Sequence, residues 1–334
     1  QPNQTMKHNL DWSETDFETL APDAIPATSY KPAGDRGRYD RDYTHWDGVP
    51  ARNQYRLAWR NMAANTGERT LISALIPPGS AHVDAVFSAA AIDAPTLVAT
   101  AASSAGLLSD FAIRVAPKAH IRAPQLERLP RLPAGHPLLQ GVYLRTLRLN
   151  CVTDAYADLW RGCWSDEFTQ DAWTSTDHVF TDLGDIAKEW SASTPLRRAA
   201  DRRQALVEID ALVALMLGVT ADQLCTVYRT QFAVLYGYDH DQYTYDANGR
   251  VVPNPVLVAW RKKGDRISLE ERTHTNQAGN TYVYELPFGT YDREHDMRVA
   301  YAEFEHRLQN LRETSGEPSL PRGAAERPQP AESP

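Results

Sequence analysis

The side chains of this sequence that could do chemistry do not form a catalytic pattern. Two acidic pairs, Asp239 with Asp241 and Glu270 with Glu271, have the residue type that general acid–base work requires. Carboxylates act in this way only when a pocket holds them beside a substrate, and both pairs are more typical of exposed, charged turns. We therefore predict no catalytic residue in this chain.

The histidines and cysteines also lack the spacing of a metal site. The ten histidines and three cysteines are scattered along the chain, and no CxxC pair occurs. Metal sites need ligands at characteristic short spacings, whereas histidines with acidic neighbours are expected in any acidic region. The histidines of that kind are His178, His240, His295 and His306. We predict no metal ligand among them.

Motifs that bind nucleotides or activate a nucleophile are absent as well. The sequence contains no GxGxxG, GxxxxGK[ST], HExxH or GxSxG pattern. It also lacks the Asn/Asp-Pro-Pro-Tyr/Phe motif of amino-methyltransferases. Asn254-Pro255 is followed by Val256, so the second proline and the aromatic ring that would stack on a flipped base are both missing. We predict no cofactor in this chain.

Positive charge is concentrated in residues 50–133, although the formal net charge of the chain is −8. This stretch holds nine Lys and Arg against five Asp and Glu, whereas residues 1–49 hold five against nine. Phosphate contacts act over short, screened distances, so a basic region can bind a polyanion even in an acidic protein. An excess of this size also occurs by ordinary scatter, and both interpretations stay open at this point.

Length and composition indicate a folded protein of about two domains. The 334 residues are 42% hydrophobic and 23% charged, which is enough apolar material for packed cores. The longest weakly charged stretch, 83–113, is interrupted by Asp84, Asp93 and Asp110, and a carboxylate is costly inside a bilayer. With few cysteines and no signal-peptide pattern at its start, the chain is expected to be cytoplasmic and not to contact a membrane.

Periodicity and turn residues predict an α+β fold that begins with a mixed α/β domain at residues 50–133. Strands are expected at 55–60 and 70–76, a helix of small residues at 96–115 and extended chain at 120–126. Residues 1–49 form an irregular lead-in, expected to pack on this domain through aromatic side chains. These are Trp12, Phe17, Tyr30, Tyr39, Tyr43 and Trp46.

The rest of the chain is predicted to be helical, with a short β-hairpin region before a C-terminal helix. A helical scaffold domain spans 134–238, with helices at 138–150, 154–168 and 196–217 and a further helix that a capping box at Thr220 opens. Residues 239–313 hold the turn Asn248-Gly249, strands at 256–260 and 281–285, and a helix at 292–312. Residues 314–334 form a tail predicted to be disordered.

Seven sequence blocks stand out along the chain. They are YRLAWR at 55–60, TGERT at 66–70, LIPPG at 75–79, KAH at 118–120, QLERLP at 125–130, LRLNCVT at 147–153 and EIDALVA at 208–214. In type and order these blocks resemble the C-terminal target-recognition and helical region of large adenine-specific DNA methyltransferases. This family includes single-chain type IIG restriction–modification enzymes and the PglX and DISARM methylases of bacterial phage defence. Ser103-Ser104 and Pro117-Lys118 depart from the family's Asn-Ser and Gly at the corresponding places.

The resemblance implies that residues 50–133 are a target-recognition domain for double-stranded DNA. The catalytic half is missing here, so S-adenosylmethionine and base flipping would belong to a separate methyltransferase domain or subunit. On the DNA face we expect Lys118, His120 and Arg122. We expect Arg52, Arg56 and His82, which lies in the polar loop 80–84, to support this contact with DNA.

Structural roles are more natural for some side chains of this domain. Arg60 and Arg69 are expected to brace the fold, and Trp59 and Phe87 to lie in the core. Two other functions stay open for the chain. It could be a protein-interaction subunit of a phage-defence complex without DNA contact, which its acidic balance would suit, or an enzyme of unrecognised type.

Overall fold

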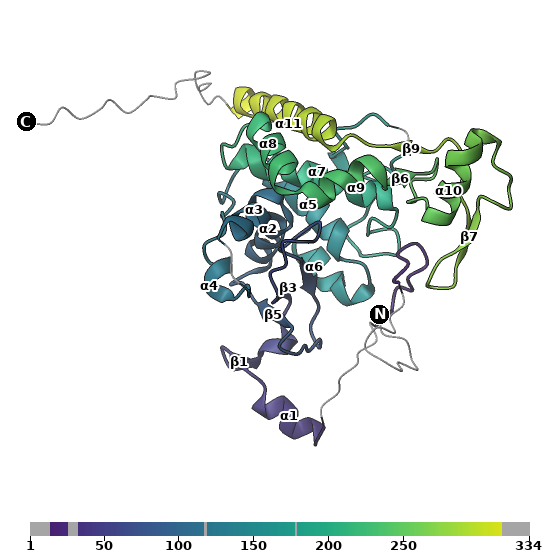
Figure 1. Ribbon diagram of the computed structural model, residues 1–334. Coiled ribbons are helices and arrows are strands. Elements are labelled where there is room, and N and C mark those ends of the chain that lie inside the picture. Colours follow the sequence, from purple (N-terminus) through teal and green to yellow (C-terminus); the bar gives the residue numbers. More distant parts are fainter. Residues whose placement is uncertain (1–13, 26–32, 117–118, 178, 316–334) are drawn as a thin grey trace, which may run out of the picture.

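The computed structural model describes residues 14–25, 33–116, 119–177 and 179–315 (Figure 1). It confirms the α+β class, because helices dominate and the strands form small antiparallel sheets. In Figure 1 the helices α2, α3, α5 and α7 fill the centre and α11 runs along the top. The sheet of β3 and β5 lies below them, and a lobe with α10 and β7 projects at the right.

The three-stranded sheet lies in the predicted α/β region and has the order β4-β3-β5. Its strands are β3 (Arg56–Arg60), β4 (Ser73–Ile76) and β5 (Val86–Ala89). Leu57 lies opposite Leu75, and Trp59 lies opposite Phe87. Because side chains alternate between the faces of a strand, these residues share the face that packs on α2 and the helices behind it. The expected strands and the core position of Trp59 are confirmed, whereas Phe87 is only partly buried and stacks on Trp59 at the edge of that core.

The predicted helix at 96–115 is two helices, α2 (Ala94–Ala105) and α3 (Leu107–Val115), that meet at Gly106 with a bend of 65°. Asp93 caps α2 by accepting the Thr96 amide at 2.7 Å. The amide of Leu107, the first residue of α3, donates instead to Asp210 of α7 at 2.6 Å. A distant carboxylate thus satisfies the free amide that the break creates, and local sequence could not reveal it.

Asp210 lies at the junction of α2 and α3, and one of its two carboxylate oxygens, Oδ2, has no hydrogen-bond partner among the described residues. Its side chain is fully buried. Burial raises the pKa of Asp210 to about 6, although the charges of Arg69 and Arg293 oppose the shift. The folded protein therefore favours the protonated acid more than the unfolded chain does.

Asp210 is expected to make the fold less stable as the pH rises from about 4 to about 7. Its folded pKa is about 6, against about 3.9 in an unfolded chain. The protonated carboxyl therefore stabilises the fold fully when the pH is below the unfolded-state pKa. This stabilisation is lost as the pH rises through the folded-state pKa, and the free energy of unfolding falls by about 3 kcal/mol in total. Asp210→Asn should lack this loss while keeping the acceptor for Leu107. Urea unfolding of both proteins across this range measures the difference, and parallel pH profiles would contradict the expectation.

The helical layer surrounds α7, which is buried on nearly all sides. Its helices are α5 (Leu139–Asn150), α6 (Ala157–Gly162), α7 (Ala199–Met216), α8 (Ala221–Gln231), α9 (Ala233–Asp241) and α11 (Arg293–Ser315). Short 3-10 turns, η2 (Asp154–Tyr156) and η3 (Asp166–Gln170), flank α6 where one helix at 154–168 was predicted. The capping box at Thr220 is confirmed, and Gly218 follows α7 with a φ of +71°.

The C-terminal lobe corrects one prediction. Residues 256–260, predicted as a strand, belong to the helix α10 (Asn254–Lys263). Val256 and Leu257 pack on Ile267, Tyr284 and Phe288, and Pro255 lies in the first turn, where a helix tolerates proline. Strands β7 (Thr273–Thr275) and β8 (Thr281–Val283) form a hairpin, β6 (Thr244–Tyr245) pairs with β9 (Gly289–Thr290), and η4 (Gly264–Arg266) follows α10.

One aromatic side chain of the lead-in packs differently from the prediction. Phe17 lies under the guanidinium of Arg202 on α7, 4.3 Å from it, and so contacts the helical layer rather than the α/β domain. Asp16 accepts hydrogen bonds from Asn280 and Tyr282 of the C-terminal lobe. The remaining small elements are α1 (Arg36–Asp42), β1 (His45–Trp46), β2 (Val49–Pro50), η1 (Ala51–Asn53) and α4 (Ala123–Leu126). Trp12, Tyr30 and the tail beyond residue 315 lie outside the described residues.

Among the described residues, no single helix has the length and apolar composition needed to cross a membrane. The bent pair α2 and α3 meets both criteria only when the two helices are counted together.

Candidate nucleic-acid interface

One face of the sheet points away from α2 and is only partly open to solvent, and we call it the outer sheet face. It consists of the side chains that alternate with the core positions: Arg56, Ala58, Arg60, Ile72, Ala74, Ile76, Val86 and Ser88. Helix α2 packs against the opposite face. Ile72 is 49% exposed and Ala74 is exposed, so this part of the outer sheet face is open to solvent.

A short extended segment lengthens the sheet beyond β3. Met62 and His120 form an antiparallel bridge, and the Ile121 amide donates to the Asn61 carbonyl at 2.7 Å. Ile121 is buried, whereas Met62 is 61% exposed and His120 is exposed. The alternation therefore puts His120 beside Met62 on the solvent side.

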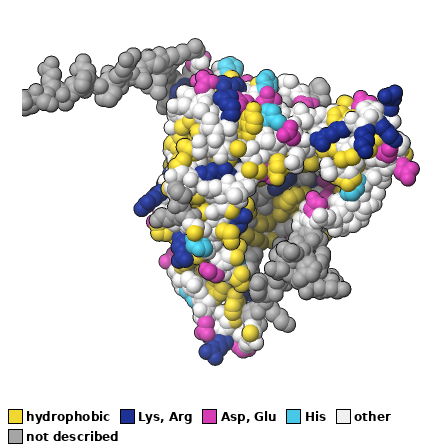
Figure 2. Space-filling model, viewed as in Figure 1, with side chains coloured by type: hydrophobic (Ala, Val, Ile, Leu, Met, Phe, Trp, Pro, Cys, Tyr) yellow, Lys and Arg dark blue, Asp and Glu magenta, His cyan; other side chains and the backbone are white. Residues whose placement is uncertain are grey.

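Arg122 begins the basic edge of the domain. It is exposed, and its guanidinium lies 6.0 Å from the centre of the Phe87 ring. Its backbone amide donates to Gln125 of the short helix α4, where extended chain was predicted. Arg128 and Arg131 follow, and both are exposed. None of these three arginines forms an ion pair within the described part of the chain. In Figure 2 dark blue and cyan side chains appear at the left, where Figure 1 places α4. We call Arg122, Arg128 and Arg131 the α4 basic edge.

Arg52 and Arg56 are not available to DNA, which corrects their predicted supporting role. Arg52 is only 8% exposed and pairs with Asp40 of α1 at 2.6 Å. Arg56 is 1% exposed and donates to Ser88 at 3.1 Å and to the backbone carbonyl of Ser80. Both guanidinium groups hold neighbouring loops in place, because a buried cation must satisfy its donors inside the protein.

His82 lies over the sheet rather than reaching out from its loop. Its Nε2 is 2.7 Å from the Ser88 hydroxyl, and the ring is half-buried. Burial, together with the positive charge of Arg56, lowers the pKa of His82. The ring is therefore neutral at pH 7 and adds no charge that would attract phosphate. Lys118, the remaining predicted residue, lies outside the described residues.

Asp110 organises the contact between the α/β domain and the helices, a role that sequence reasoning missed. This buried carboxylate accepts the amides of Thr70 and Leu71 and pairs with Arg69 at 2.6 Å. Arg114 also pairs with it and donates to the Gln231 carbonyl of α8 at 2.7 Å. The bracing role predicted for Arg69 is confirmed. For Arg60 the only hydrogen bond among the described residues goes to the neighbouring Met62 carbonyl, and the side chain is half-exposed.

Several arginines of this domain are bound within the fold, and the others are at least partly exposed to solvent. Arg52, Arg56, Arg69 and Arg114 all bind carboxylates or carbonyls of the fold, although the buried Nε atoms of Arg52 and Arg56 have no hydrogen-bond partner among the described residues. Among the described residues of this domain, only the α4 basic edge, with His120 and Arg60 beside it, presents unpaired basic side chains to solvent. Asp84 and Glu127 are exposed acids nearby in the sequence, so the surface is locally basic but not uniformly so. This distribution supports contact with separate phosphates along a backbone.

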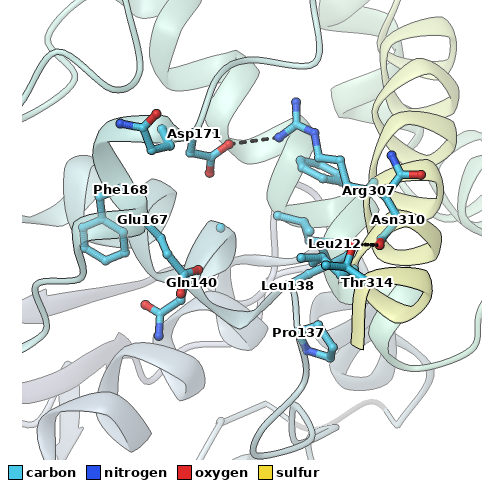
Figure 3. Close-up of a pocket in the computed structure, with 14 residues that line it drawn as sticks. Pro137, Leu138, Gln140, Glu167, Phe168, Asp171, Leu212, Arg307, Asn310 and Thr314 are labelled. Carbon is cyan, nitrogen blue, oxygen red and sulfur yellow. Dashed lines mark hydrogen bonds and ion pairs between the residues drawn. The ribbon is translucent and has the colours of Figure 1, made fainter. Parts of the chain in front are cut away.

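A pocket of about 440 Å³ lies elsewhere, between α5, η3 and the C-terminal part of α11 (Figure 3). Leu138, Leu212 and Phe304 form its apolar floor. Figure 3 shows Arg307 reaching across to Asp171, with the pair at 3.0 Å. Burial alone would raise the pKa of Asp171, but Arg145 and Arg307 outweigh it and the pKa is lowered. Asp171 is thus a permanently ionised structural partner and not a proton donor.

No family model, no curated protein and no solved structure matches this chain. Its function is therefore inferred from the geometry of the surface and from the sequence motifs.

Proposed function

We propose that this chain is the DNA sequence-recognition module of an adenine-specific DNA methyltransferase of a restriction–modification or phage-defence system. The observation that carries the proposal is the α4 basic edge. Its three arginines are exposed and have no acidic partner in the described chain, whereas the other described arginines of residues 50–133, apart from Arg60, are buried or paired. Exposed, unpaired arginines beside an open sheet suit a duplex backbone, because each can neutralise one phosphate.

In this proposal the duplex lies along the α4 basic edge and against the outer sheet face. Arginine–phosphate contacts would fix the register, and side chains such as His120 and Arg60 would lie near the grooves, where sequence is read. This chain supplies binding and orientation. S-adenosylmethionine, base flipping and methyl transfer would come from a separate methyltransferase domain or subunit, as the motif resemblance implies. The rigid anchoring through Asp110 supports a recognition surface held in fixed orientation.

A protein partner is the second candidate, because apolar side chains share this surface. Met62 is 61% exposed, Ile72 is 49% exposed and Val83 is 46% exposed. Clustered exposed apolar residues are typical of protein contacts rather than of phosphate contacts. A protein-interaction subunit of a phage-defence complex would use this face without touching DNA.

A salt titration of DNA binding separates the two functions. For the DNA module, the affinity for a short duplex should fall linearly with salt on logarithmic axes, with a slope of about −0.9 per phosphate neutralised. Arg122→Glu combined with Arg128→Glu should weaken binding and reduce the slope by about two. Fluorescence anisotropy at several salt concentrations measures both quantities.

The matched control is Arg161→Glu on α6, which reverses another exposed arginine whose only ion pair is a weak surface contact with Asp158. It should leave the slope unchanged. DNA binding that is absent, or that is equal in all variants, would contradict the recognition module. Co-purification with a methyltransferase that is lost on Met62→Asp or Ile72→Asp would then support the protein-interaction function.

A further inference from the structure

The C-terminal lobe carries a second concentration of exposed positive charge, remote in sequence from the α4 basic edge. Arg261, Lys262 and Lys263 form the last turn of α10, and Arg266 follows in η4. All four are exposed. In Figure 2 dark blue side chains gather on this lobe at the right of the view. We call these four residues the α10 basic cluster.

The packing of the lobe holds this cluster toward solvent. Val256 and Leu257 are buried against the small apolar core of the lobe, so the opposite side of α10 must face outward. Gly264, with a φ of +60°, ends the helix directly after the cationic turn. Cations in a last helical turn favour the helix dipole, but Arg266 lies beyond the helix, and the dipole does not account for it.

Two of the four cations have internal partners and two do not. Lys263 pairs with Glu271, and Arg261 donates to the Asp241 carbonyl at 2.7 Å. Lys262 and Arg266 form no ion pair or hydrogen bond within the described part of the chain. The nearby Asp265 accepts the Trp260 indole N–H at 3.0 Å and is an exposed acid beside the cluster.

An open groove of about 970 Å³, with both polar and apolar lining residues, adjoins the cluster between α9 and α10. Arg261, His240, Asn254 and Gln242 line it, and Asp241 is the one acidic residue among its lining residues. His240 uses Nδ1 on the Tyr236 carbonyl at 2.7 Å, so its Nε2 remains for a ligand. Amide and guanidinium donors beside free cations match the oxygen acceptors of a sugar–phosphate backbone.

We propose that the α10 basic cluster and the adjoining groove form a second, sequence-independent contact with the phosphate backbone of duplex DNA. The contact rests on the proposed DNA-recognition function and extends it, because it would hold the duplex at a place separate from the α4 basic edge. Contacts of this kind position DNA without reading bases. They weaken uniformly with salt on every sequence.

The test is Lys262→Glu combined with Arg266→Glu in the full chain, with anisotropy measured on several duplexes of unrelated sequence. The double variant should reduce the salt slope by about two and weaken binding by the same factor on every duplex. Lys188→Glu, another exposed lysine, is the matched control and should change neither quantity. Because the substituted residues are exposed, thermal unfolding should be unchanged in all three proteins.

The outcomes distinguish this contact from the function on which it rests. Binding that Arg122→Glu weakens but Lys262→Glu with Arg266→Glu leaves intact would overturn the second contact alone. Absence of salt-dependent binding in the unmodified chain would overturn both. Unchanged DNA affinity together with lost binding to poly-glutamate would identify the cluster as a site for an acidic protein, and the DNA assignment would be wrong.

Discussion

Replacing Asp110 with alanine is expected to lower the free energy of unfolding by about 3–5 kcal/mol. The carboxylate is 0% exposed and accepts the Thr70 amide at 3.0 Å and the Leu71 amide at 3.2 Å. It also pairs with Arg69 and Arg114, which are largely buried. Its removal would leave two buried amides without an acceptor and would take the only charged partner in the described chain from two guanidinium groups that otherwise bind backbone carbonyls. Each buried group that loses its partner costs free energy comparable to a lost hydrogen bond or more.

Urea unfolding of Asp110→Ala measures this loss of stability, and two further variants serve as comparisons. Asp84→Ala removes an exposed acid of the same domain and should change stability by no more than about 0.5 kcal/mol. Asp110→Asn keeps one acceptor oxygen but no charge, so its loss should fall between the other two. A loss below about 1 kcal/mol in Asp110→Ala would mean that the contact between sheet and helices does not depend on this carboxylate.

The elements with strong local signals could be predicted from the sequence. The strands around Trp59 and Leu75 follow from alternating apolar residues and the Pro-Pro-Gly stop, and the helix after Thr220 follows from its capping box. The helix α11 was likewise expected from the spacing of Met297, Phe304 and Leu308. These signals act over a few residues, so tertiary contacts do not override them.

The secondary-structure predictions were wrong where contacts with residues distant in the sequence determine the local structure. The break at Gly106 depends on Asp210, which accepts an amide about a hundred positions earlier in the chain. Val256–Trp260 has the composition of a strand, but packing of one side on Tyr284 and Phe288 favours a helix. Composition alone cannot tell a buried helix from a buried strand in so short a run.

The candidate site was predictable only in part, for an electrostatic reason. Counting arginines in the sequence locates a basic region, but it does not show which guanidinium groups are bound by other residues of the folded chain. Arg52 pairs with Asp40 and Arg56 donates to hydroxyl and carbonyl oxygens, whereas Arg122 has no such side-chain partner in the described chain. Partner identity is a property of the tertiary structure, so exposed cations such as Arg128 and Arg131 become distinguishable only there.

The second large effect is expected at Glu208, in the centre of the helical layer. Its side chain is 0% exposed and accepts four donors. These are Arg145 Nε at 2.5 Å, the amide and hydroxyl of Thr174 at 2.7 Å each, and Gln204 Nε2 at 2.9 Å. Burial disfavours the charged form of Arg145, but Asp171 and Glu208 outweigh burial and raise its pKa. Glu208→Ala should therefore cost about 3–5 kcal/mol in urea unfolding.

A double variant tests whether the loss of stability in Glu208→Ala comes from the Arg145 guanidinium that is left buried without this partner. Glu208→Leu combined with Arg145→Met removes both partners and fills the space with apolar atoms, while Asp171 keeps its bond to Arg307 at 3.0 Å. Because replacing a buried ion pair is often less costly than breaking it, the double variant should be more stable than Glu208→Ala. A double variant that is less stable than Glu208→Ala would instead assign the stabilisation to the attraction between Arg145 and Glu208 themselves.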